Sequence, residues 1–104
     1  RSSDLTLYVS GMTGPDRKTN EYPENFEQEV KNTLDGILLV LKEAGMDFSN
    51  AVAVQVYLTD MSLFQRMNAV YTTYFPEPRP TRTTVGVASL VGKAKIEITV
   101  TARK

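Results

Sequence analysis

Two charged residues and two hydroxyl-bearing residues near the C-terminal end have the types and spacing of a site for a small anion. Arg82 and Thr84 alternate in one β-rich segment, and Glu97 and Thr99 alternate in the next. Because side chains alternate between the two faces of a strand, each pair lies on one face of its own strand. If residues 90–93 form the turn of a hairpin, all four side chains share one surface. Arg82 and Glu97 are then too far apart for a direct ion pair, which leaves space for a small anionic substrate between them.

Residues of these types also have an ordinary structural interpretation. Arg and Glu on the solvent face of a strand often serve only solubility or pair across strands, and Thr is a common β-former. Gly11 and Gly14 follow a strand, but no Gly-Lys-Ser/Thr follows them as in a phosphate loop, so they indicate a turn. Tyr71, Tyr74 and Phe75 indicate core or interface packing rather than a base-stacking platform, because no basic groove accompanies them.

The composition excludes several kinds of chemistry. The 104-residue chain contains no His, Cys or Trp. A Ser-His-Asp triad, a Cys nucleophile, a zinc finger and a disulfide framework are therefore excluded. Catalysis must use Asp, Glu, Lys, Arg, Tyr, Ser, Thr and backbone groups. The 12 basic residues balance 12 acidic ones, and this zero net charge gives no electrostatic indication of nucleic-acid binding.

The length predicts a single domain over residues 1–104. The longest apolar stretch falls well short of the ~20 residues of a membrane-spanning helix. We expect no signal peptide, and these 104 residues contain no Asn-x-Ser/Thr acceptor. We therefore expect a cytoplasmic protein without a membrane or nucleic-acid partner. Since the chain begins at Arg1 rather than Met, a mitochondrial location is expected if a transit segment was removed before that residue.

Regular elements must position these residues, and apolar periodicity predicts where the elements lie. One helix has Pro23 in its first turn and ends before Gly45, and a second helix ends before Pro76. Four strands are predicted as well, at residues 5–10, 51–58, 82–88 and 95–102.

The order strand, helix, strand, helix, strand, strand predicts an α+β fold. Crossover connections of one hand then place both helices on one face of a single mixed sheet. Residues 51–58 carry apolar side chains on both faces of the predicted strand, which is typical of a strand covered on both sides. No element remains to cover the second face. Self-association through that open face is therefore expected.

The last two strands also carry a resemblance to a known family. Residues 80–90 read PTRTTVGVASL and residues 95–98 read KIEI, which resembles the C-terminal signature of the RidA/YjgF reactive-intermediate deaminase family. Further segments agree with the family in the expected order: VSG at 9–11, LKEAG at 41–45, VQVYLTD at 54–60 and MNAVY at 67–71. The chain is identified as a member of this family over nearly its whole length.

The resemblance implies both an architecture and an activity. The architecture is a chorismate-mutase-like fold assembled as a homotrimer, with small-molecule sites in the clefts between subunits. The activity is hydrolysis of reactive enamines and imines, such as 2-aminoacrylate and 2-iminopropanoate, to 2-keto acids and ammonium. Such intermediates arise from pyridoxal-phosphate-dependent dehydratases, so the family serves metabolite damage control. The family needs no cofactor or metal, and none is expected here.

The resemblance also implies roles for six residues. Arg82 would hold the carboxylate of a 2-imino acid through two parallel hydrogen bonds, which Lys could not reproduce. Glu97 would hold and polarise the attacking water and relay its proton to the leaving nitrogen. The other four would line the substrate cleft: Ser10, Gly11, Asn68 and Thr84, the last at a position where many members carry Cys.

One family feature is expected to be missing from this sequence. Members usually carry Gly-Pro-Tyr in an N-terminal strand upstream of Leu5, and its Tyr contributes to the cleft. The chain begins after that point, so the sheet is expected to lack this strand. Two other functions stay open. The first alternative to the deaminase is a non-catalytic trimeric regulator or chaperone-like protein that binds small carboxylates. The second is a translation-inhibiting endoribonuclease, which ranks lower because the chain has no His and no excess basic charge.

Overall fold

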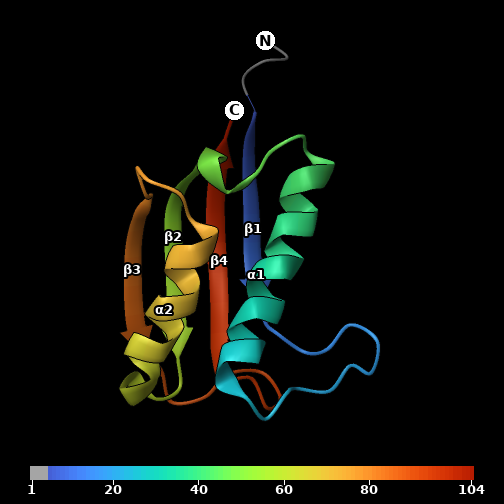
Figure 1. The fold of residues 1–104 in the computed structure, drawn as a ribbon, viewed down its shortest axis with the longest axis vertical. Coiled ribbons are helices and arrows are strands. Elements are labelled where there is room, and N and C mark those ends of the chain that lie inside the picture. The colour runs from blue at the N-terminus through green and yellow to red at the C-terminus, as the bar shows by residue number, and fades with distance from the viewer. Residues whose placement is uncertain (1–4) are drawn as a thin grey trace.

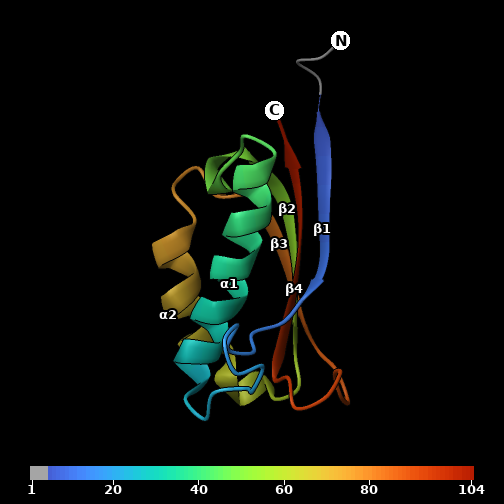
Figure 2. The ribbon, with the colours of Figure 1, turned by 90° about the vertical axis from the view of Figure 1, so that its right-hand side faces the viewer.

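The computed structural model describes residues 5–104, in which a four-stranded mixed sheet forms one layer and two helices form the other. Both helices cover the same face of the sheet (Figure 1, Figure 2). This arrangement confirms the α+β fold and the element order predicted from the sequence. The family strand expected upstream of Leu5 lies outside the described residues. In chain order the elements are β1 (Thr6–Met12), α1 (Phe26–Glu43), β2 (Ala51–Leu58), α2 (Phe64–Tyr74), β3 (Thr81–Gly86) and β4 (Ile96–Arg103).

The order of the strands in the sheet is β1-β4-β2-β3, so β2 separates the last two strands of the chain (Figure 1). β2 pairs in parallel with β3 and antiparallel with β4. The predicted hairpin of the last two strands is therefore wrong. The reason is that β4 presents an entirely apolar face, with Ile96, Ile98 and Val100 fully buried. A central position buries that face and pairs both edges of the strand, while β3 takes the edge of the sheet.

The two faces of the sheet differ in their environment. The inner face, which the helices cover, carries Val54, Val56 and Leu58 of β2 beside the buried residues of β4. The opposite, open face has no covering element within residues 5–104 (Figure 2). Neither helix of these described residues is long and apolar enough to cross a membrane. The inner face is completed by fully buried residues of α1 at helical spacing, namely Val30, Leu34, Ile37 and Leu41.

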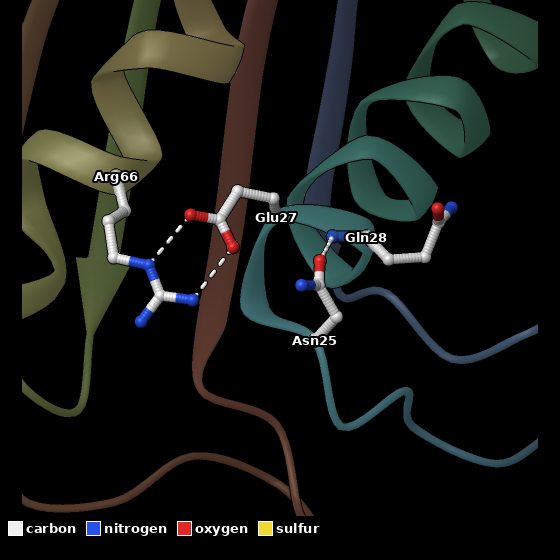
Figure 3. Close-up of polar contacts among 4 residues, drawn as sticks. All are labelled: Asn25, Glu27, Gln28 and Arg66. Carbon is white, nitrogen blue, oxygen red and sulfur yellow. Dashed lines mark hydrogen bonds and ion pairs between the residues drawn. The ribbon is translucent and has the colours of Figure 1, made fainter.

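Polar contacts cap the start of α1 and connect it to α2 (Figure 3). The helix begins later than predicted, because the Asn25 side chain caps it by accepting a 2.8 Å hydrogen bond from the Gln28 N–H. Pro23 therefore lies before the helix. Arg66 of α2 donates two hydrogen bonds of 2.7 Å to the carboxylate of Glu27. Hydrogen bonding from Arg66 lowers the pKa of Glu27 to about 2.

A buried carboxyl group connects α1 to the start of β4. The Glu29 side chain is fully buried, and its Oε2 accepts a 2.8 Å hydrogen bond from the Lys95 N–H. Its Oε1 has no hydrogen-bond partner among residues 5–104. Burial raises the pKa of Glu29, and Lys95 opposes that shift. Since Lys95 precedes Ile96, this contact fixes the point at which β4 enters the sheet.

Glu29→Gln is expected to make folding less sensitive to pH. A raised pKa in the folded state means that the proton stabilises the fold below the ordinary pKa of the carboxyl, and that this stability is lost as pH rises through the folded value. The amide keeps the acceptor for Lys95 and cannot ionise. The variant and the wild type should therefore match near pH ~4. At pH ~8 the variant should be more stable than the wild type, because burial disfavours the charged carboxylate and the amide carries no charge.

Urea unfolding across this pH range measures the difference. Glu24→Gln is the matched control, because Glu24 is exposed and should give no such divergence. If Glu29→Gln follows the same pH curve as the wild type, the Glu29 carboxyl does not limit stability at neutral pH.

Candidate functional site

Arg82 stands on the edge strand β3 and is directed towards α2. It pairs with Val54, whose side chain is buried in the inner face, so the two side chains lie on the same face of the sheet. The Nη1 of Arg82 donates a 2.6 Å hydrogen bond to Oδ1 of Asn68. Its guanidinium carbon lies 4.5 Å from the ring centre of Tyr71 and 5.4 Å from that of Phe64. Arg82, Asn68, Tyr71 and Phe64 are called the arginine cluster below.

The arginine cluster is suited to binding an anion. Arg82 is half-buried, and no carboxylate within residues 5–104 forms an ion pair with it. A guanidinium on aromatic faces is only weakly hydrated, and its planar donors match a carboxylate through two parallel hydrogen bonds. Thr84 lies two residues further along β3 and pairs with Val56, so it shares the face of Arg82. The fold therefore brings together three of the predicted site residues, Arg82, Asn68 and Thr84.

A second group of predicted residues gathers where β1 meets β4. Ser10 and Gly11 form an irregularity in the pairing between Val9 and Met12, and β1 continues past Gly11 instead of ending there. Gly11 has φ +70° and donates its N–H to Oγ1 of Thr99 at 3.3 Å.

Glu97 lies close to this irregularity. A Cβ placed on Gly11 would lie 3.7 Å from Oε2 of Glu97, so the glycine leaves open space beside the carboxylate. Ser10, Gly11, Glu97 and Thr99 are called the glutamate cluster below. A carboxylate beside a backbone N–H and two hydroxyl groups can hold a water molecule and accept its proton.

The two clusters lie on opposite faces of the sheet. Arg82 pairs with Val54 of β2, whereas Glu97 pairs with Tyr57. Val54 and Tyr57 are three residues apart, and an odd separation along a strand places side chains on opposite faces. The prediction that Arg82, Thr84, Glu97 and Thr99 share one surface is therefore wrong. It failed because it assumed direct pairing of β3 with β4.

Sequence reasoning missed part of the arginine cluster. It assigned Tyr71 to core packing, and the ring is indeed buried and stacks on Phe75 at 4.2 Å between centroids. The same ring also supports the Arg82 guanidinium, and Phe64 supports it from the preceding turns. The spacing of Phe64, Asn68 and Tyr71 at i, i+4 and i+7 marks one face of a helix and is the signal that predicts their proximity.

The chemistry available to these residues is that of binding and proton transfer. Within residues 5–104, no group of three or more acidic side chains could hold a metal ion. The arginine cluster can bind a carboxylate, and the glutamate cluster can position water. Fold and clusters together define a small α+β protein with an arginine suited to binding an anion at the edge of a half-covered sheet.

Comparisons with known proteins identify this class more closely. A sequence model of the family described as Endoribonuclease L-PSP matches residues 2–104. The chain therefore belongs to this family, the RidA/YjgF family that its C-terminal motifs resemble, and that prediction is confirmed.

Individual relatives align with this chain over most of their own length. A RutC family protein of Saccharolobus solfataricus is 43% identical over 99 residues, which cover 94% of this chain and 79% of that protein. The 2-iminobutanoate/2-iminopropanoate deaminase of Mus musculus is 38% identical over 96 residues, covering 91% of this chain and 71% of the relative. The crystal structure of RidA from the Antarctic bacterium Psychrobacter superposes with a TM-score of 0.91 at 30% identity, covering 98% of this chain and 86% of that one.

Proposed function

We propose that this protein is a hydrolase that converts reactive enamines and imines of the 2-aminoacrylate and 2-iminopropanoate type into 2-keto acids and ammonium. The observation that carries this proposal is Arg82, a half-buried guanidinium on two aromatic rings without a carboxylate partner among residues 5–104. Its forked donors suit the carboxylate of a 2-imino acid. The mouse relative at 38% identity is named for this reaction, which supports the proposal.

The proposed mechanism divides binding and chemistry between the two clusters. Arg82 holds the substrate carboxylate, while Asn68 orients the guanidinium and Thr84 adds a hydroxyl group beside it. Glu97 accepts a proton from a water molecule as the water oxygen bonds to the carbon of the C=N group. That proton passes to nitrogen and gives a carbinolamine. Glu97 then moves the remaining hydroxyl proton to nitrogen, and ammonia leaves as the C–N bond breaks and the C=O bond forms. Such imines hydrolyse readily unaided, so positioning and general-base catalysis are sufficient.

The glutamate cluster adds a second set of contacts in this scheme. The Gly11 N–H and the Ser10 hydroxyl lie in the irregular segment of β1 that borders Glu97. We assign both to substrate or water binding. No step of the reaction calls for a cofactor, because addition of water and loss of ammonia leave the oxidation state of the substrate unchanged.

Each proposed site joins two copies of the chain. Arg82 and Glu97 lie on opposite faces of the sheet, so one copy does not bring them together. The open face also exposes 73% of Tyr8 and 39% of Val85, which favours an interface there. We propose a homotrimer in which Arg82 of one subunit meets Glu97 of a neighbour. The proposed setting is the cytoplasm, where the enzyme removes intermediates released by dehydratases.

Release of 2-keto acid from freshly generated 2-iminopropanoate tests the activity. A dehydratase supplies the imine, and semicarbazide traps the imine that survives. We expect the wild-type protein to reduce the trapped imine and to accelerate keto-acid release. Equal imine loss with and without the protein contradicts the proposed function. Tight keto-acid binding without acceleration then favours the regulator, and RNA cleavage that survives Arg82→Ala and Glu97→Ala favours the endoribonuclease.

Mixing two inactive variants tests whether the site is shared between subunits. Arg82→Ala and Glu97→Ala are each expected to lose activity, and co-refolding them in equal amounts should restore complete sites in about one quarter of the positions of a random cyclic trimer. A mixture prepared without subunit exchange is the control. If co-refolded protein of confirmed mixed composition stays as inactive as either variant, both residues act within one chain.

A further inference from the structure

A cavity of about 380 Å³ lies beside Arg82. Its walls are formed by six residues, Asn68, Tyr71, Thr72, Arg79, Pro80 and Arg82. Its volume lies within the ~300–1,000 Å³ that is usual for small-molecule sites and leaves room beyond a three-carbon imino acid. Two of the six residues are arginines and none is acidic. The cavity therefore has the charge of a site for an anion larger than the simplest substrate of the proposed reaction.

Arg79 is the second cation of the cavity, and the chain holds it in place. Its Nε donates to the Phe75 carbonyl at 3.0 Å, and its Nη2 donates to the Thr72 carbonyl at 3.3 Å. Its Nη1 donates to Glu77 at 3.0 Å. The Glu77 side chain is 79% exposed, and such surface pairs are weak. Arg79 thus offers a fixed positive charge that its carboxylate partner offsets only in part.

The Tyr71 hydroxyl group supplies a second, independent observation. The residue is 2% exposed, and its hydroxyl oxygen has no hydrogen-bond partner among the described residues 5–104. Stacking on Phe75 holds the ring in one orientation. Burial raises the pKa of Tyr71, and the charges of Arg82 and Arg79 oppose that shift. Like any phenol at neutral pH, the hydroxyl carries its proton and can donate it in a hydrogen bond. A buried hydroxyl without a partner is unfavourable, and an oxygen of a ligand at this wall of the cavity would supply the missing partner.

We propose that this cavity binds a second carboxylate, so that the protein accepts dicarboxylic 2-imino acids and their 2-oxo acid products. Arg82 holds the carboxylate next to the imine, and Arg79 holds the second carboxylate. The Tyr71 hydroxyl, in the wall that both arginines share, donates to this second carboxylate. This inference rests on the proposed function and specifies its substrate class. Two guanidinium groups match the two negative charges of such a ligand, whereas a monocarboxylate leaves Arg79 and Tyr71 unused.

Titration calorimetry with two stable product analogues tests the proposal. 2-Oxoglutarate and 2-oxopentanoate share a five-carbon chain and differ in the terminal carboxylate. We expect the wild type to bind 2-oxoglutarate at least about ten-fold more tightly, a difference of about 1.4 kcal/mol. Arg79→Gln and Tyr71→Phe should each reduce this ratio to about three-fold or less. Arg17→Gln, which removes one positive charge from an exposed loop, is the control and should keep the ratio.

The Tyr71→Phe variant separates a ligand role from a structural one. Removing a buried hydroxyl without a partner should leave the free protein at least as stable in thermal unfolding, because the ring contacts remain. Equal affinity of the wild type for both acids overturns the subsite, and so does a preference that both variants retain.

These titrations, together with the imine hydrolysis assay, distinguish this inference from the proposed function. If the protein hydrolyses 2-iminopropanoate but does not prefer the dicarboxylate, the proposed function is supported and the subsite is overturned. A preference that depends on Arg79 and Tyr71, without any turnover, supports the subsite and contradicts the hydrolase. If neither acid binds, the subsite is overturned as well.

Discussion

Replacing Arg82 with alanine is expected to lower kcat/KM for hydrolysis of 2-iminopropanoate by at least about 100-fold, or about 3 kcal/mol of transition-state stabilisation. The guanidinium lies over two rings and is held by Asn68, so its direction is set before the substrate arrives. Two charge-assisted hydrogen bonds to a carboxylate, at about 1.5–3 kcal/mol each, account for the size of the loss. Steady-state keto-acid release measures the effect.

Two further variants show whether the effect depends on the fork of the guanidinium. Arg82→Lys keeps the charge and loses the paired donors, so activity should fall nearly as far as in Arg82→Ala. Arg66→Ala removes an arginine from α2 that already pairs with Glu27, and activity should change by less than about two-fold. Thermal unfolding of each variant checks that the fold persists. Imine consumption by a folded Arg82→Ala protein at the wild-type rate excludes the proposed role of this residue.

Gly14→Ala adds only one methyl group, yet it is expected to lower the free energy of unfolding strongly. Gly14 packs directly on α1, and a Cβ there would overlap the Glu29 carbonyl oxygen and lie 2.5 Å from Oγ1 of Thr33. Thr33 cannot move freely, because its hydroxyl donates to the same carbonyl at 2.8 Å. Since the overlap is with helix backbone, either the loop or the helix must shift. We expect the free energy of unfolding to fall by about 2–3 kcal/mol, the upper range for overpacking.

The same contact links this loop to the glutamate cluster. Glu29 binds the Lys95 N–H, so a displaced α1 would also shift the entry of β4. Equilibrium unfolding in urea measures the loss, and Gly36→Ala is the matched control. A Cβ at Gly36 would meet only the flexible end of Met12 at 3.2 Å, and alanine favours a helix over glycine by about 1 kcal/mol. The control should therefore be unchanged or slightly more stable. Equal midpoints for Gly14→Ala and the wild type contradict close packing of the loop.

Local patterns predicted the elements well, because they reflect steric and hydrophobic rules that act over a few residues. The apolar spacing from Phe26 to Leu41 predicts α1, and the alternation of Ile96, Ile98 and Val100 predicts a half-buried β4. The start of α1 was missed because the Asn25 cap, two residues beyond Pro23, governs where the helix begins. Family motifs named Arg82, Glu97 and Asn68, and the structure joins the first of these to the third.

The strand partners could not be predicted from those local patterns. The last two strands are close in sequence and read as a hairpin, yet each pairs with β2. Pairing is decided by burial across the whole molecule, since only a central position buries the apolar face of β4 and satisfies both of its edges. That single difference transfers Glu97 to the face of the sheet opposite Arg82.

The sequence by itself determined the fold class, the family and the types of residue that can act in a chain without His or Cys. Only the tertiary structure decided which of those residues meet. It placed Arg82 on the rings of Tyr71 and Phe64, and it put Glu97 beside Gly11 on the open face. The physical reason is that side-chain direction along a strand has a period of two residues, so strand order and register decide which face each group occupies.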